Sequence, residues 1–131
     1  MTSPIRVLHC IHSLSGGGAE KQLRMLAEGS AKQAMNVGIF CVNDKGNDIQ
    51  DASVRIYKSS HANTYNFNIF GSLHAAIADF RPDVLHAWLP GSVTIPAMLL
   101  AVKIRIPCVF SYRVAMFFGR HVGVVRGIDD Q

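Results

Sequence analysis

The sequence predicts an α/β fold, a Rossmann-like three-layer domain in which helices cover both faces of a mostly parallel sheet. Short apolar runs rich in β-branched residues alternate with longer stretches that have helical spacing. The chain has 131 residues, 49% of them hydrophobic, which is enough for one core without disulfides or a structural metal. In such sheets ligands bind at the carboxyl ends of the strands, so we look for functional residues there.

The first unit consists of a strand, a glycine-rich turn and a helix. Residues 5–11 form the strand and residues 12–18 the turn. The helix that follows has apolar or small residues at helical spacing, while Lys21, Arg24, Glu28 and Lys32 face outward. Its predicted inner positions are Leu23, Leu26, Ala27, Ala31 and Ala34.

Two further strands and a second helix follow. Residues 37–42 and 54–57 are strands separated by a polar loop, and residues 58–66 are polar and irregular. Asn68 is expected to cap a helix that Pro82 ends just before a strand at residues 83–88. The buried face of this helix is expected to comprise Ile69, Leu73, Ala76, Ile77 and Phe80.

The last predicted elements are a helix and a strand. Ser92 is the expected N-cap of a helix that runs to about Lys103, with Pro96 in its first turn. Pro107 opens a strand at residues 108–112. Residues 114–131 form a poorly specified tail, because glycines interrupt its apolar spacing.

Charge and cysteine content exclude several classes of protein. The net charge of +4 is spread along the chain without a dense basic run, so we expect no nucleic-acid partner. Cys10, Cys41 and Cys108 lie in apolar runs, and no Cys/His spacing typical of a metal site occurs. We see no secretion signal, and the apolar stretch at residues 95–102 is too short to span a membrane. We therefore expect a cytoplasmic protein.

The turn after the first strand is a candidate phosphate site. Gly16, Gly17 and Gly18 lie where backbone N–H groups and the helix dipole can receive a phosphate, although a turn without a ligand is the alternative. Glu20 suits the positive end of the helix, and it is also a candidate contact to a bound sugar. His12 ends the first strand at the ligand edge. The sequence here matches neither the dinucleotide-binding pattern nor the Walker pattern. A nicotinamide-dependent enzyme, with Asp44 as the acid that binds the ribose, is therefore the weaker interpretation.

The strand at residues 83–88 carries the other candidates. His86 lies two residues before its carboxyl end, where a catalytic or ligand-binding role and a packing role are equally supported. Trp88 ends this strand as a candidate substrate contact, whereas His9 lies within the first strand and is expected to be an interior histidine. Arg113 follows the last strand and either clamps a phosphate or carboxylate or lies on the surface.

Three segments together resemble a known enzyme family. Residues 5–23 contain IRVLHCI and SLSGGGAEKQL, residues 81–90 read RPDVLHAWLP, and residues 106–111 read IPCVFS. In this order they are similar to the N-terminal domain of GT-B fold glycosyltransferases of family 4. The resemblance implies a retaining, metal-independent transferase with a nucleotide-sugar as co-substrate, no tightly bound cofactor, and a glycan or lipid-linked acceptor in polysaccharide or glycolipid synthesis.

The resemblance also assigns roles to individual residues. It implies that Gly16, Gly17 and Gly18 approach the donor diphosphate and that His86 lies on the acceptor side. Arg113 stands where many members have a histidine that contacts the donor sugar, which puts that role in doubt.

On this interpretation residues 1–131 form one acceptor-side domain, and the C-terminal donor-nucleotide domain is missing. Cationic groups that stabilise the leaving diphosphate would be absent with it, so we expect the chain to be inactive alone. The alternatives are a stand-alone nucleotide- or phosphate-binding module, and an interaction protein that associates through Phe117 and Phe118. Peripheral contact with the inner face of a membrane through Phe117, Phe118, Arg120 and Arg126 is a further hypothesis.

Overall fold

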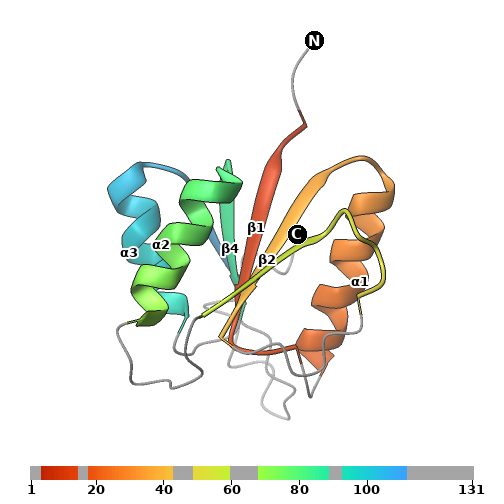
Figure 1. Cartoon of the computed structure of the whole chain (residues 1–131), viewed down its shortest axis with the longest axis horizontal. Coiled ribbons are helices and arrows are strands. Elements are labelled where there is room, and N and C mark those ends of the chain that lie inside the picture. Colours follow the sequence, from red (N-terminus) through yellow and green to blue (C-terminus); the bar gives the residue numbers. More distant parts are fainter. Residues whose placement is uncertain (1–3, 15–17, 43–48, 60–67, 89–92, 112–131) are drawn as a thin grey trace, which may run out of the picture.

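The computed structural model describes residues 4–14, 18–42, 49–59, 68–88 and 93–111 (Figure 1). Within these ranges, strands alternate with helices. The strands are β1 (Arg6–Ile11), β2 (Asn36–Cys41), β3 (Arg55–Lys58), β4 (Val84–Trp88) and β5 (Cys108–Ser111). The helices are α1 (Gly18–Lys32), α2 (Asn68–Phe80) and α3 (Thr94–Ile104).

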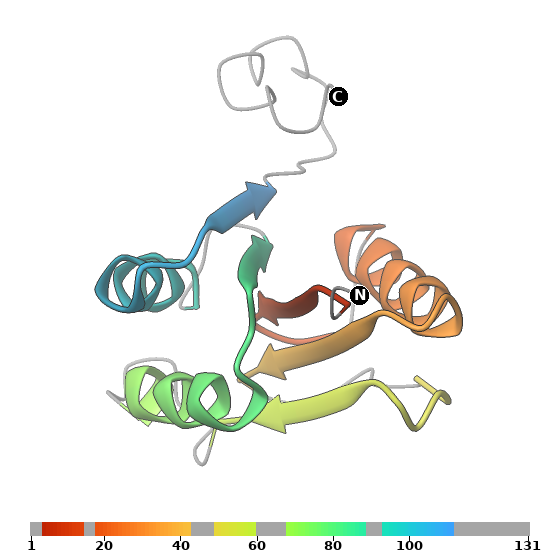
Figure 2. The ribbon, with the colours of Figure 1, turned by 90° about the horizontal axis from the view of Figure 1, so that it is seen from above.

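The strands form one parallel sheet in the order β3-β2-β1-β4-β5. Helices α2 and α3 lie side by side on one face, and α1 lies on the other face beside β1 and β2 (Figure 2). This is the predicted Rossmann-like three-layer α/β fold. Side chains alternate across β1, so Leu8 and Cys10 pack under α2 and α3, whereas Ile11 packs with Leu23 of α1.

The predicted elements are confirmed within about two residues at most ends, but three details differ. Leu26 is 45% exposed, because α1 buries only the narrow face that contains Leu23 and Ala27. Ala34 lies beyond α1 and has a φ of 65°. Helix α3 has Val93 at its N-cap position instead of Ser92, without a side-chain cap, and Ser92 lies outside the described residues.

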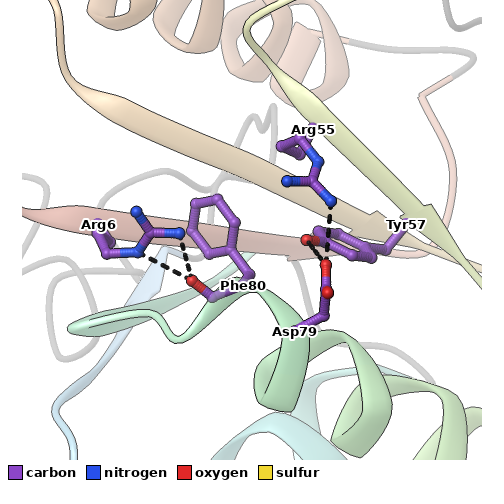
Figure 3. A network of polar contacts seen from close by, with 5 residues as sticks. All are labelled: Arg6, Arg55, Tyr57, Asp79 and Phe80. Carbon is purple, nitrogen blue, oxygen red and sulfur yellow. Dashed lines mark hydrogen bonds and ion pairs between the residues drawn. The ribbon is translucent and has the colours of Figure 1, made fainter.

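Polar contacts tie the end of α2 to the amino ends of β1 and β3 (Figure 3). Nε and Nη2 of Arg6 donate to the carbonyl oxygen of Phe80, at 2.9 and 2.5 Å, and the guanidinium carbon lies 4.6 Å from the centre of the Phe80 ring. This cation complements the negative end of the helix. Oδ2 of Asp79 accepts hydrogen bonds from Arg55 (3.0 Å) and Tyr57 (2.7 Å). The network therefore lies at the edge of the sheet opposite the expected ligand edge.

A close approach between α2 and the sheet requires glycine at position 38. A Cβ atom there would lie 3.1 Å from Cε1 of Phe80 and 3.2 Å from Cδ1 of Leu8. Both neighbours are buried in the core and have little room to move. Gly38 thus lets the Phe80 ring pack directly on β1 and β2.

We expect Gly38→Ala to lower the free energy of unfolding by about 1–3 kcal/mol, because the new methyl group overpacks the core. The matched control is Gly71→Ala in α2, where an added Cβ meets nothing within 4 Å. The control should raise stability by about 0.5–1 kcal/mol, because alanine favours helix. Urea denaturation of both variants measures the difference, and equal stabilities would contradict the packing argument.

Candidate functional site

The carboxyl edge between β1 and β4 is where the chain changes direction. These strands are neighbours, with Cys10 opposite Ala87. From β1 the chain continues to α1 on one face, and from β4 it continues to α3 on the opposite face. In doubly wound sheets this switch point is the place where ligands bind. The structure therefore places the ends of β1 and β4, with His12 and Trp88, at the expected ligand edge.

Four polar or aromatic side chains meet just below this edge and form what we call the polar cluster: His9 of β1, His86 and Trp88 of β4, and Ser111 of β5. The register pairs His9 with His86 and Trp88 with Ser111. The indole Nε1 of Trp88 donates to Nδ1 of His9 at 3.0 Å. Nε2 of His86 lies 2.7 Å from Oγ of Ser111. Contacts between side chains thus connect all three strands.

The rings of the polar cluster also pack on one another. The centres of the His86 and Trp88 rings are 4.5 Å apart, with 20° between their planes. His9 lies 5.1 Å from His86 and 5.9 Å from Trp88, in both cases tilted. The stack limits how far the His86 ring can turn, because its face is covered by the indole.

His9 is an interior histidine, as predicted. It is 3% exposed, and burial, with a smaller contribution from His86, lowers its pKa from 6.5 to about 3. A neutral imidazole has one nitrogen that accepts, and Trp88 donates to Nδ1, so the His9 proton lies on Nε2. His9 therefore keeps its acceptor throughout the physiological range of pH.

The remaining predicted site residues are placed as follows. Trp88 is 6% exposed and packs with Ile11 and Leu14, so most of the ring that was expected to contact substrate belongs to the core. His86 is half-buried and stacks on Trp88, which packs in the same core cluster as Leu23 of α1. His12 is half-buried directly after β1, and its carbonyl oxygen accepts a 2.8 Å hydrogen bond from the Val42 amide.

Of the predicted site residues near the start of α1, the structure describes Gly18 and Glu20. Gly18 is exposed, and a Cβ atom added to it would meet nothing within 4 Å, whereas Glu20 is half-buried in the first helical turn. Arg24, predicted to face outward, instead donates from Nη1 to the carbonyl oxygen of Leu14 and so holds the segment after β1 against α1. Gly16, Gly17 and Arg113 lie outside the described residues.

Sequence reasoning missed the contact between Ser111 and His86 and the partnership between His9 and Trp88. Alternation along β4 indicates that His86 and Trp88 share a face. The partners on β1 and β5 depend on strand order and register, which the spacing of residues along the chain does not contain.

The sequence profile of Glycosyltransferase Family 4 matches residues 16–124. The chain belongs to this family. The match confirms the resemblance found in the sequence and spans most of the chain, including the three glycines at positions 16–18, His86 and Ser111. No curated protein sequence shows a match.

Solved structures of other proteins share the fold. This family 4 domain superposes on MurG of Acinetobacter baumannii with a TM-score of 0.62 at 19% identity, covering 93% of the chain and 39% of MurG. The calicheamicin glycosyltransferase CalG4 gives 0.57 at 16% identity, with 94% and 37% covered. UDP-GlcNAc 2-epimerase from Neisseria meningitidis gives 0.53 at 19% identity, with 81% and 32% covered. The fold is that of a GT-B N-terminal domain, and the chain spans at most 39% of these proteins.

Metal-binding clusters and membrane-spanning helices are both absent from the described ranges. Within them, no group of three or more His, Cys, Asp or Glu side chains is arranged to hold a metal ion. None of the helices in the same ranges is both long enough and apolar enough to cross a bilayer.

The lowered pKa of His9 predicts loss of stability in acid. Below about pH 6.5 the unfolded chain protonates His9, whereas the folded domain does so only near pH 3, so the free energy of unfolding falls as the pH drops between these values. Between pH 7 and about pH 4.5 this one group should account for about 2–3 kcal/mol.

The variant His9→Asn lacks the titrating group and should lose correspondingly less stability over this range. His74→Gln, on the exposed side of α2, is the matched control and should behave as the unaltered chain does. Urea denaturation at the two pH values measures the effect. Equal losses for His9→Asn and the unaltered chain would contradict it.

Proposed function

We propose that this domain is the acceptor-side part of a retaining, nucleotide-sugar-dependent glycosyltransferase that acts in polysaccharide or glycolipid synthesis. Membership of family 4 supports the reaction class. The observation that carries the assignment of the site is the position of His86, near the carboxyl ends of the neighbouring strands β1 and β4. An imidazole at this edge can exchange hydrogen bonds with a sugar hydroxyl or a phosphate oxygen.

The proposal gives the other residues at this edge distinct roles. Gly18 begins α1, and Gly16 and Gly17 precede it in the sequence. The amino end of this helix favours the negative charge of a donor diphosphate. Glu20 and His12 are proposed to bind sugar hydroxyls, and Arg113 to bind a phosphate or an acceptor carboxylate. Trp88 contributes through its position next to His86, with the small part of its surface that remains accessible.

Transfer also needs positive groups that stabilise the departing nucleoside diphosphate. The described residues around His86 offer histidine, serine and tryptophan, with no lysine or arginine in the polar cluster. The GT-B neighbours are more than twice as long as this chain. We therefore propose that a second domain supplies those groups and that residues 1–131 alone do not catalyse transfer.

A transfer assay with a panel of nucleotide-sugars tests the proposal. The 131-residue chain should show no turnover, and a longer polypeptide that adds a donor-nucleotide domain should be active. In the active form His86→Ala should reduce kcat/KM by about 100-fold, the usual size of a lost acid, base or hydrogen-bonding group. His74→Gln is the matched control. Full activity of His86→Ala would contradict the assignment.

Calorimetry distinguishes the two-domain proposal from the alternative function, a stand-alone nucleotide- or phosphate-binding module. If the 131-residue chain carries only half of the donor site, titration with UDP, GDP or ADP up to about millimolar concentration should give no measurable heat of binding. Micromolar binding of a free nucleotide to the 131-residue chain would favour the module and contradict the two-domain proposal.

A second candidate function is peripheral contact with an anionic membrane. The outer face of α3 consists of Ile95, Met98, Leu99 and Val102, which are between 47% and 77% exposed. Lys103 and Arg105 are exposed at the end of the helix, and the sequence has no Asp or Glu between positions 84 and 128. An apolar face bordered by cations suits the surface of a bilayer with acidic lipids. The tail residues proposed for this role from the sequence lie outside the described residues.

Vesicle sedimentation tests the contact. With about 30% anionic lipid at low salt, we expect binding that the double substitution Leu99→Ser and Val102→Ser lowers at least several-fold. The matched control replaces Met25 and Leu26 of α1, which are also exposed and apolar, by serine. Equal binding of the two double variants would show that α3 is not the contact surface.

A further inference from the structure

His86 is held on two sides by groups from two strands. Its face stacks on Trp88 of the same strand, with 4.5 Å between ring centres. Its edge meets Ser111 of β5, with 2.7 Å between Nε2 and Oγ. A stack limits rotation about one axis and a hydrogen bond fixes the direction of one ring nitrogen, so together they restrict the imidazole to one orientation.

Trp88 is in turn held by His9. The 3.0 Å bond from Nε1 to Nδ1 satisfies the indole N–H, and no buried side-chain nitrogen or oxygen in the described ranges lacks a partner. Trp88 and His9 come from the neighbouring strands β4 and β1, so this bond also joins the two strands after which the chain continues to opposite faces of the sheet. A phenyl ring in place of the indole would keep the stack and lose the connection to β1.

We propose that His9 and Trp88 are positioning residues for His86, and that Ser111 completes the support by holding its Nε2. Neither His9 nor Trp88 needs to touch a ligand for this role. The benefit of holding His86 rests on the proposed function, because a histidine that contacts a sugar during transfer must be positioned within a fraction of an ångström. The support itself is a property of the domain alone.

The chemistry of His9 suits an anchor. Its Nδ1 accepts a hydrogen bond only while the ring is neutral, and burial keeps it neutral well below the pH at which an exposed histidine takes up a proton. The groups facing it are His86 and Trp88. The bond that holds Trp88 therefore persists throughout the physiological range of pH.

The test uses ¹⁵N-histidine NMR of the 131-residue chain. Trp88→Phe keeps an aromatic face and removes the donor, and His9→Leu removes the acceptor. Both should change the ¹⁵N shifts and the tautomer balance of the His86 ring, whereas His9→Asn, which keeps an acceptor near the position of Nδ1, should restore the native pattern. Ser111→Ala should change the His86 ring as well, and Ser111→Thr, which retains the hydroxyl, should not.

A purely structural role for His9 and Trp88 would lower stability without moving the His86 signals. Amide spectra show which variants remain folded, and His74→Gln serves as the control for unrelated changes. If Trp88→Phe does not fold, the pair His9→Leu and His9→Asn decides the question. Unchanged His86 shifts in every folded variant that lacks the donor or the acceptor would overturn the proposal.

Activity measurements separate this inference from the proposed function. In an active longer transferase, Trp88→Phe should lower kcat by about tenfold, with the KM for the donor changed less than about twofold. Altered His86 signals in a protein without transferase activity would refute the proposed function and leave the support of His86 intact. Altered signals with an unchanged kcat would overturn the positioning role.

Discussion

The hydrogen bond from the Trp88 indole to His9 joins the central strand β1 to its neighbour β4, after which the chain continues to opposite faces of the sheet. Both groups are buried, and a buried indole N–H or imidazole nitrogen without a partner costs free energy. The bond therefore satisfies the indole N–H of Trp88 and Nδ1 of His9. The position of His86 depends on this pair, because its ring stacks on the indole while Ser111 meets its edge.

At the opposite edge of the sheet, where the strands begin, other interactions hold α2 against the strands. Arg6 neutralises the end of α2, Asp79 connects this helix to β3, and Gly38 allows Phe80 to lie against the strands. The ion pair between Arg55 and Asp79 is exposed and contributes little by itself. Packing of Phe80 against the sheet has the larger effect. One end of the sheet is therefore secured mainly by core contacts, while the other carries the polar cluster.

Much of this arrangement could be predicted from the sequence. Helical and strand spacing are local signals, and they placed the described elements and the buried His9. Ser111 as a partner of His86 could not be found in this way, because it depends on the pairing of β4 with β5. Leu26 has the spacing of a core residue and is exposed, since the width of the buried face of α1 depends on the sheet beneath it.

Membership of family 4 gives this polar edge its chemical context. Our account holds that the polar cluster is already assembled in this domain, before any donor or acceptor binds. Scalar coupling across the hydrogen bond between Nε1 of Trp88 and Nδ1 of His9, measured by NMR on the ligand-free chain, tests this most directly. We predict a measurable coupling and slow exchange of the indole proton from about pH 5 to about pH 8. An indole proton that exchanges freely with water, without coupling to His9, would contradict the account.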